Sequence, residues 1–151
     1  MDQAILVGLN VDQNEQGVRK SLDELEHLAL ALGIKTKEKV LQNAKQITPK
    51  YYIGSGKVLE IKKMIEVLDV DMVIFDDTLS PAQLKHLEKD LDTQIMDRSF
   101  LIMSIFALRA QTKEAKLEVA LAQKNYMLPR LIGLGNTLSR QGGGTFNAKG
   151  P

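Results

Sequence analysis

The alternation of two kinds of hydrophobic segment along the first 97 residues is the feature that most constrains the fold. Short apolar runs of the strand type alternate with segments whose apolar residues recur every three or four positions, as in amphipathic helices. The expected strands are residues 4–9, 34–40, 71–75 and 94–97, and the expected helices are residues 18–32, 57–68 and 81–91. This order favours an α/β fold with a small, mainly parallel four-stranded sheet and flanking helices.

After residue 98 the pattern is helical only. Ser99 is a candidate N-cap for a first helix, and Thr112 for a second. The second helix carries leucines in a three-four spacing close to a coiled-coil seam, and Pro129 is expected to kink it. Because the chain offers this leucine stripe no partner helix, we expect a returning helix outside the chain, or a homodimer through the unpaired helix.

The formal net charge of +1 conceals an uneven distribution. Residues 1–97 hold 12 Lys and Arg against 17 Asp and Glu, whereas residues 98–151 hold 8 against 2, and no acidic residue follows Glu118. We therefore divide the chain into an α/β subdomain, residues 1–98, and a projecting helical arm, residues 99–151, with a Gly-rich tip. A purely cationic segment is expected where a chain approaches phosphates, and a solvated basic face is the alternative.

Composition excludes several classes of protein. The chain contains no cysteine, which rules out disulfides, thiolate zinc sites and cysteine nucleophiles and fits a reducing compartment such as the cytoplasm. The apolar runs are too short to cross a bilayer, and the N-terminus lacks the basic and then hydrophobic order of an export signal. We expect a cytoplasmic protein with no membrane span.

One glycine-rich turn resembles the end of a phosphate-binding loop. A complete loop would need a glycine at position 51 and a hydroxyl at position 58, where the chain has Tyr51 and Val58. The turn is therefore predicted to be structural, with a backbone anion site as the alternative. That possible anion-binding site consists of Gly54, Ser55, Gly56 and Lys57.

Other titratable residues give no catalytic or metal site. Asp76 and Asp77 end an expected parallel strand, where a divalent cation is one interpretation and a simple turn the favoured one. His27 and His86 lie among charged residues without companion ligands, so both are predicted to be surface histidines.

The C-terminal segment carries a different kind of signal. Arg140 and Gln141 offer donors for a phosphate or a base edge, and the three glycines after them allow close backbone approach to a partner. A flexible linker is the alternative interpretation.

Five segments of the chain resemble the N-terminal region of HflX-type GTPases. They are Tyr52-Ile53-Gly54-Ser55-Gly56-Lys57, Phe106-Ala107-Leu108-Arg109-Ala110-Gln111-Thr112, Asn125-Tyr126-Met127-Leu128-Pro129-Arg130-Leu131, Leu138-Ser139-Arg140-Gln141-Gly142-Gly143-Gly144 and Lys149-Gly150-Pro151. In that family an α/β subdomain precedes a long antiparallel helical hairpin and then a GTPase domain with the P-loop. The missing partner helix and the missing P-loop of this chain both fit that arrangement.

The resemblance implies binding to the large ribosomal subunit and its rRNA, and GTP-dependent splitting or rescue of ribosomes under stress. The rRNA-binding residues would be Arg130, Arg140, Gln141, Gly142, Gly143, Gly144, Phe146 and Lys149. GTP and Mg²⁺ would be held by the absent C-terminal GTPase domain, so this chain has no expected cofactor and is not expected to hydrolyse GTP alone. The alternative function is a nucleotide- or small-ligand-binding α/β regulatory domain.

Overall fold

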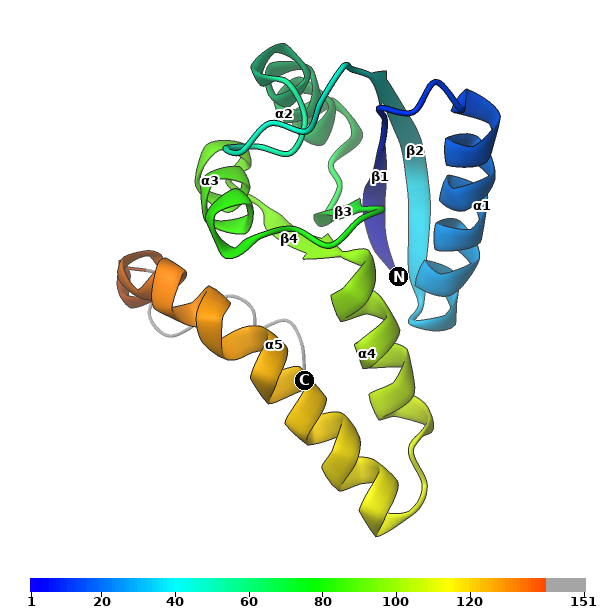
Figure 1. Cartoon of the computed structure of the whole chain (residues 1–151), viewed down its shortest axis with the longest axis vertical. Helices are drawn as coiled ribbons and strands as arrows, with labels where there is room; N and C mark the ends of the chain where they lie inside the picture. Colours follow the sequence, from blue (N-terminus) through cyan, green and yellow to red (C-terminus); the bar gives the residue numbers. More distant parts are fainter. Residues whose placement is uncertain (141–151) are drawn as a thin grey trace.

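The computed structural model describes the backbone of residues 1–140 and the side chains of residues 1–130. Its elements are, in order, β1 (Asp2–Asn10), α1 (Glu15–Ala31), β2 (Ile34–Asn43), α2 (Ser55–Leu68), β3 (Met72–Phe75), α3 (Pro81–Leu91), β4 (Gln94–Asp97), α4 (Arg98–Arg109) and α5 (Lys113–Arg140). Strands and helices alternate up to β4, after which only helices follow (Figure 1). The predicted α/β class is confirmed.

The four strands form one parallel sheet in the order β2-β1-β3-β4. Side chains of β1 alternate between two cores, so Ile5 and Val7 face one side of the sheet while Ala4 and Leu6 face the other. Helices α2 and α3 cover the first side, and α1 and α4 cover the second (Figure 1). From β1 the chain moves outward to β2 and then crosses back to β3 on the other side of β1.

Two helix starts match the sequence prediction. The Ser80 hydroxyl accepts a hydrogen bond from the Gln83 amide at 3.1 Å, in a capping box directly before Pro81. The Thr112 hydroxyl accepts from the Ala115 amide at 3.0 Å at the start of α5. Local side-chain chemistry is sufficient to define both boundaries.

The prediction that Ser99 caps the next helix is wrong. Asp97 is the N-cap of α4, and its carboxylate accepts from the Phe100 amide at 2.9 Å. Asp97 ends β4 with an extended backbone, which places a charged acceptor at the helix start, and α4 therefore already contains Ser99. The Ser99 hydroxyl instead pairs with that of Thr78.

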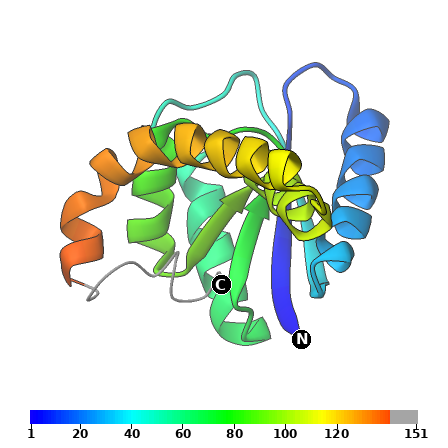
Figure 2. The same cartoon turned by 90° about the horizontal axis from the view of Figure 1, so that it is seen from below.

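Helices α4 and α5 form a V whose closed end points away from the sheet (Figure 1). α4 leaves the end of β4, and α5 returns along it and contacts α3. Helix α5 continues through Pro129, and its last turns change direction, which fits the kink expected at proline (Figure 2). The arm was expected to project freely from the base, but α5 instead folds back onto it.

Candidate functional site

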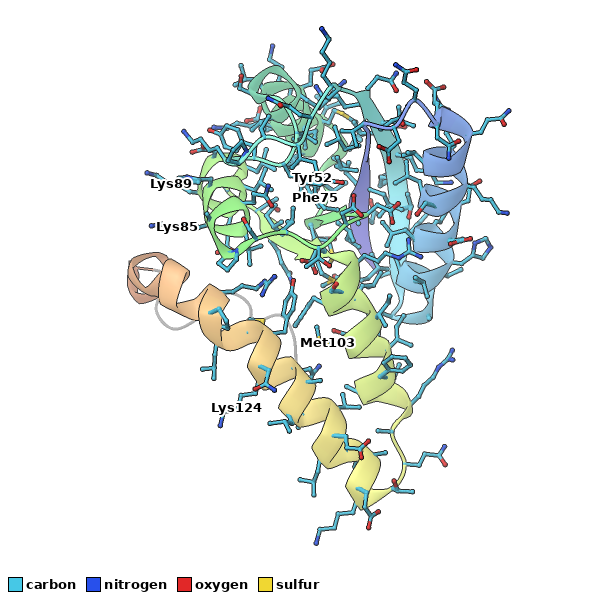
Figure 3. The ribbon with its side chains drawn as sticks, viewed as in Figure 1. Tyr52, Phe75, Lys85, Lys89, Met103 and Lys124 are labelled. Carbon is cyan, nitrogen blue, oxygen red and sulfur yellow. The ribbon has the colours of Figure 1, made fainter. Side chains whose placement is uncertain are left out.

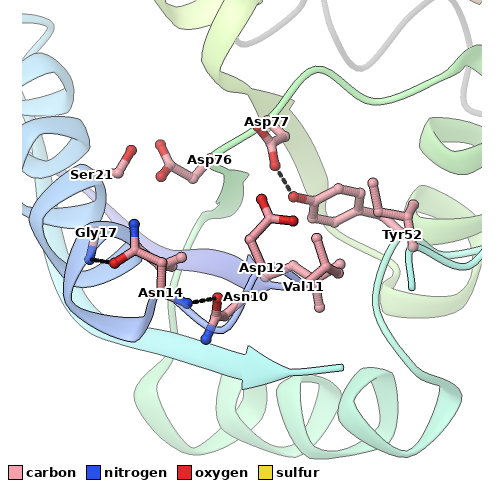
Figure 4. Close-up of a pocket in the computed structure, with 12 residues that line it drawn as sticks. Asn10, Val11, Asp12, Asn14, Gly17, Ser21, Tyr52, Asp76 and Asp77 are labelled. Atoms are coloured by element: carbon pink, nitrogen blue, oxygen red, sulfur yellow. Dashed lines mark hydrogen bonds between the residues drawn. The ribbon is translucent and has the colours of Figure 1, made fainter. Parts of the chain in front are cut away.

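A polar pocket of about 290 Å³ opens at the carboxyl ends of β1 and β3 (Figure 4). The chain passes from β1 to its neighbour β2 on one side and then returns to β3 on the other side of β1. The strand order therefore reverses between β1 and β3. Open parallel sheets place their ligand sites at this position. The pocket is lined by Leu9, Asn10, Val11, Asp12, Asn14, Gly17, Val18, Ser21, Ile47, Tyr52, Asp76 and Asp77.

Asparagines hold the rim that follows β1. The buried Asn10 accepts from the Asn14 amide at 2.9 Å and donates to the Asn43 side chain at 2.8 Å. Asn14 in turn caps α1, where its side chain accepts from the Gly17 amide at 3.2 Å. These bonds fix the loop between β1 and α1 against β2.

Tyr52 forms the opposite wall. It is buried, with a backbone φ of 69°. Its ring lies edge-on to the Phe75 ring, with 6.0 Å between the two ring centres. Its hydroxyl donates to the Asp77 carboxylate. Burial, together with Asp77, raises the pKa of Tyr52, so the hydroxyl stays protonated as a donor.

Asp76 connects the pocket to α4. Its buried carboxylate receives a hydrogen bond from the Arg98 guanidinium at 2.6 Å, and Arg98 also bonds the Ser21 hydroxyl at 3.1 Å. Burial raises the pKa of Asp76, while Ser21 and Arg98 act in the opposite direction. Asp76 is thus a paired structural carboxylate at the floor of the pocket.

The lining of the pocket contains three carboxylates and no cationic side chain. A negatively charged phosphate would meet repulsion there rather than a counter-charge. Within the described residues no group of three or more His, Asp or Glu side chains is placed to hold a metal ion. The chemistry of the pocket therefore favours a ligand without negative charge.

The four residues of the glycine-rich turn lie elsewhere, at the start of α2. The Gly54 amide donates to the Gln42 side chain at 2.9 Å, and the Lys57 ammonium pairs with Glu60 at 3.0 Å. Ser55 and Gly56 are exposed. An anion site at this turn stays a prediction.

Both histidines lie at the surface. His27 is exposed and its Nδ1 lies 2.8 Å from the Asp23 carbonyl, whereas the half-buried His86 meets the Tyr51 ring edge-on.

The closed half of the V carries exposed cations. Arg109, Lys113, Lys116 and Lys124 are all exposed, and none has an ion pair with another described residue. Lys124 points away from α4 (Figure 3). The exposed Glu114 and Glu118 lie among these residues, so four cations outnumber two carboxylates and this part of the arm carries a net positive charge.

Arg130, which was expected at an RNA surface, is instead buried against the base. It is 9% exposed, and its guanidinium donates to the Leu79 carbonyl at 2.6 Å and to the Tyr126 carbonyl at 2.9 Å. The same group lies 3.6 Å from the centre of the Tyr126 ring. Its donors are therefore directed at the protein, not at solvent.

The remaining residues predicted to bind rRNA are beyond the side chains that the structure describes. Arg140 is the last residue of α5, and its side chain is outside the described set. Gln141, Gly142, Gly143, Gly144, Phe146 and Lys149 lie outside the described residues altogether.

Through residue 140, no helix is long and apolar enough to span a membrane.

Comparison with known proteins identifies the chain. A family model described as GTP-binding GTPase N-terminal matches residues 19–107, and one described as GTP-binding GTPase Middle Region matches residues 109–151. The GTPase HflX of Lacrimispora saccharolytica is 47% identical over 150 residues, which cover 99% of this chain. That of Escherichia coli K12 is 37% identical over the same length. The chain belongs to the HflX family of GTPases.

The HflX relatives are much longer than this chain, which spans 35% and 34% of their lengths in these two cases. A crystal structure of the protein SsGBP with GDP gives a TM-score of 0.68 at 25% identity and covers 93% of this chain and 40% of that one. A GTP-binding protein from Sulfolobus solfataricus in complex with GDP gives a TM-score of 0.65 at 24% identity, over 93% of this chain and 42% of that one. The fold of this HflX region is thus shared with solved structures.

Sequence reasoning missed three residues that organise the HflX chain here: Tyr52, Asp97 and Tyr126. Tyr52 has a left-handed backbone in a loop, which gives no sequence signal. Tyr126 lies four positions before Arg130, a spacing that puts both on one side of a helix. That spacing was the available signal, but it does not show which carboxylate the tyrosine meets.

Proposed function

We propose that this chain is the part of an HflX-type GTPase that docks onto the large ribosomal subunit, by placing cations of its arm on rRNA phosphates. The membership of the HflX family supports this proposal. Binding would occur in the cytoplasm. GTP and Mg²⁺ would act in the region of HflX-type proteins that this chain does not cover, where GTP would drive splitting or rescue of ribosomes under stress.

The observation that carries the proposal is the exposed cationic surface of the V. Arg109, Lys113, Lys116 and Lys124 are free of ion pairs within the described residues, and the sequence contains no acidic residue after Glu118. Such a surface binds nucleic acid chiefly through release of counterions from phosphates. Arg130 is left out of the proposed contact surface because it is buried and two of its guanidinium nitrogens donate to backbone carbonyls.

The test is co-sedimentation of the chain with large ribosomal subunits over a range of salt concentrations. Replacing Lys113, Lys116 and Lys124 by glutamine should weaken binding and reduce the slope of log K against log salt by about two, at roughly 0.7 to 0.9 per contact. Lys35, Lys37 and Lys62 are also exposed, so their glutamine variants form a control with the same loss of charge. Equal losses in both triple variants would reject the arm as the contact surface.

The tip is tested separately. Arg140→Ala and Lys149→Ala should each weaken subunit binding, since both are predicted to reach phosphate, and Phe146→Ala should do so if the ring stacks on an unpaired base. Wild-type binding by all three variants would exclude a role for the tip.

A second candidate function is small-ligand binding in the pocket between β1 and β3, favoured by its position in the sheet. The acidic lining disfavours a nucleotide at this position. Calorimetry with millimolar ATP and GTP should therefore give no heat of binding. A heat of binding that Asp77→Asn abolishes would show that the pocket binds a nucleotide after all.

A further inference from the structure

A single buried carboxylate joins three segments of the fold. Asp97 is 1% exposed and accepts from the Phe100 amide and from the Leu79 amide, each at 2.9 Å. Its third donor is the hydroxyl of Tyr126 on α5. One side chain at the end of β4 thus holds the start of α4, the loop between β3 and α3, and the arm.

Tyr126 and Arg130 contribute the arm's side of this junction. The Tyr126 ring stacks on the Phe100 ring, with 5.9 Å between the ring centres, and the Arg130 guanidinium lies over the Tyr126 ring. Arg130 then donates to the Leu79 carbonyl. Burying a guanidinium is costly unless its donors are bonded, and in this position two of its three nitrogens are bonded to carbonyls while Nε has no partner among the described residues. Losing the Leu79 carbonyl would leave a second nitrogen unbonded, so Arg130 favours this position of α5 over others.

Leu79 is held by both of its backbone groups. Its amide is bonded to Asp97 and its carbonyl to Arg130, and it lies two residues after the pocket-lining Asp77. At the other end of this loop, Asp76 is paired with Arg98 at the start of α4. The direction of the arm is therefore tied to the conformation of the loop that borders the pocket.

We infer that Tyr126 and Arg130 are positioning residues that fix the direction of α5 on the base and thereby orient the exposed lysines of the arm for docking. The effect on docking rests on the proposed function, whereas the fixed direction of α5 does not. Without the junction, α5 would remain attached through the turn to α4 and would sample several directions. Binding would then weaken, because only a fraction of the molecules would present the arm correctly.

The absence of cysteine from the sequence allows a direct measurement. Lys35→Cys on β2 and Asn125→Cys on α5 place nitroxide labels at two exposed positions, one on the base and one on the arm far from the turn that joins α5 to α4. The distance distribution from pulsed electron paramagnetic resonance should be narrow in the otherwise unchanged chain. It should broaden when Tyr126→Phe and Arg130→Gln are combined, and Arg130→Lys should broaden it less because lysine retains a donor for the Leu79 carbonyl.

Tyr51→Phe is the matched control, since it removes another tyrosine–aspartate bond, to Asp90, in which no residue of α5 takes part. Circular dichroism establishes that each variant is folded. If the double variant fails to fold, Tyr126→Phe alone should still broaden the distribution. An unchanged distribution in a folded variant, double or single, would overturn the inference.

The functional part is read from subunit binding by the Tyr126 and Arg130 variants without the labelling cysteines. If the correctly directed fraction falls to about one tenth, the apparent Kd rises about tenfold. Unchanged affinity in a variant with a broadened distribution would overturn the orienting role. Failure of the unmodified chain to bind subunits would reject the proposed function while leaving the distance result intact.

Discussion

The hydroxyl of Tyr126 donates a hydrogen bond to the carboxylate of Asp97, and this bond joins the helical arm to the end of β4. Burial, together with the charge of Asp97, raises the pKa of Tyr126, so the phenol remains a donor throughout the physiological range. The carboxylate also accepts two backbone amides, which keeps it satisfied at the centre of the fold.

Tyr126→Phe should lower the free energy of unfolding by about 1 to 2 kcal/mol. The variant keeps the ring and its stacking but removes a charge-assisted hydrogen bond from a buried acceptor. Urea unfolding followed by circular dichroism measures the change. Tyr51→Phe removes a bond to Asp90, which is less buried than Asp97, and should change stability by less. The reverse order would contradict the importance of the Tyr126 bond.

Glu88→Gln should stabilise the protein at neutral pH. Glu88 is 7% exposed, its Oε1 has no hydrogen-bond partner among the described residues, and burial raises its pKa above the ordinary 4.5. A raised folded-state pKa means that the folded state binds this proton more tightly than the unfolded state. The stability that protonated Glu88 gives the fold is therefore fully present below pH 4.5 and is lost as the pH rises through the folded-state pKa.

The measurement compares urea midpoints of both proteins between about pH 4 and pH 8. The advantage of the glutamine variant should grow with pH across this window. Glu66→Gln on the exposed face of α2 should show no such trend, and a pH-independent difference for Glu88→Gln would mean that its ionisation does not affect folding.

Local patterns predicted the elements of this fold well, since β3 and β4 are wholly buried, β1 is buried from Ala4 onward, and the helices that cover the sheet have apolar faces. Ser80, Pro81 and Thr112 carry their capping chemistry in the sequence itself. The start of α4 was mispredicted because Asp97 serves both β4 and α4, a double role that only the sheet geometry shows.

The candidate site was predictable only in part. Asp76 and Asp77 were placed correctly at the end of a strand, but strand order depends on long-range packing that no local pattern encodes. Arg130 was assigned to rRNA from the family resemblance and its positive charge. Its burial depends on the return of α5 to the base, and the contact with Leu79 spans 51 positions of the chain.

Gly8→Ala should destabilise the protein by about 1 to 3 kcal/mol through overpacking. A methyl group at position 8 would lie 2.9 Å from the Val18 side chain and 3.1 Å from that of Leu22, where α1 packs on β1. Gly56→Ala is the matched control, since a methyl group there meets no atom within 4 Å. Thermal unfolding measures both, and equal melting temperatures would show that α1 can move away at little cost.

The leucine stripe of α5 leads to a prediction about association. Leu117 and Leu121 are 62% and 59% exposed, and their spacing of four places them on one face of the helix. We expect the chain to self-associate through this face. Replacing both leucines by glutamine should weaken association more than tenfold, since each buried leucine contributes about 1.5 kcal/mol or more.

Sedimentation velocity over a wide range of concentrations measures this association. Leu30 and Val67 are also strongly exposed but lie on α1 and α2, so their double glutamine variant removes comparable apolar surface away from the arm. A concentration-dependent sedimentation coefficient that disappears only in the α5 variant would identify the stripe as the interface. Concentration-independent sedimentation of the unmodified chain would show that the stripe does not pair with a second copy, which leaves a helix from elsewhere in an HflX-type protein as its expected partner.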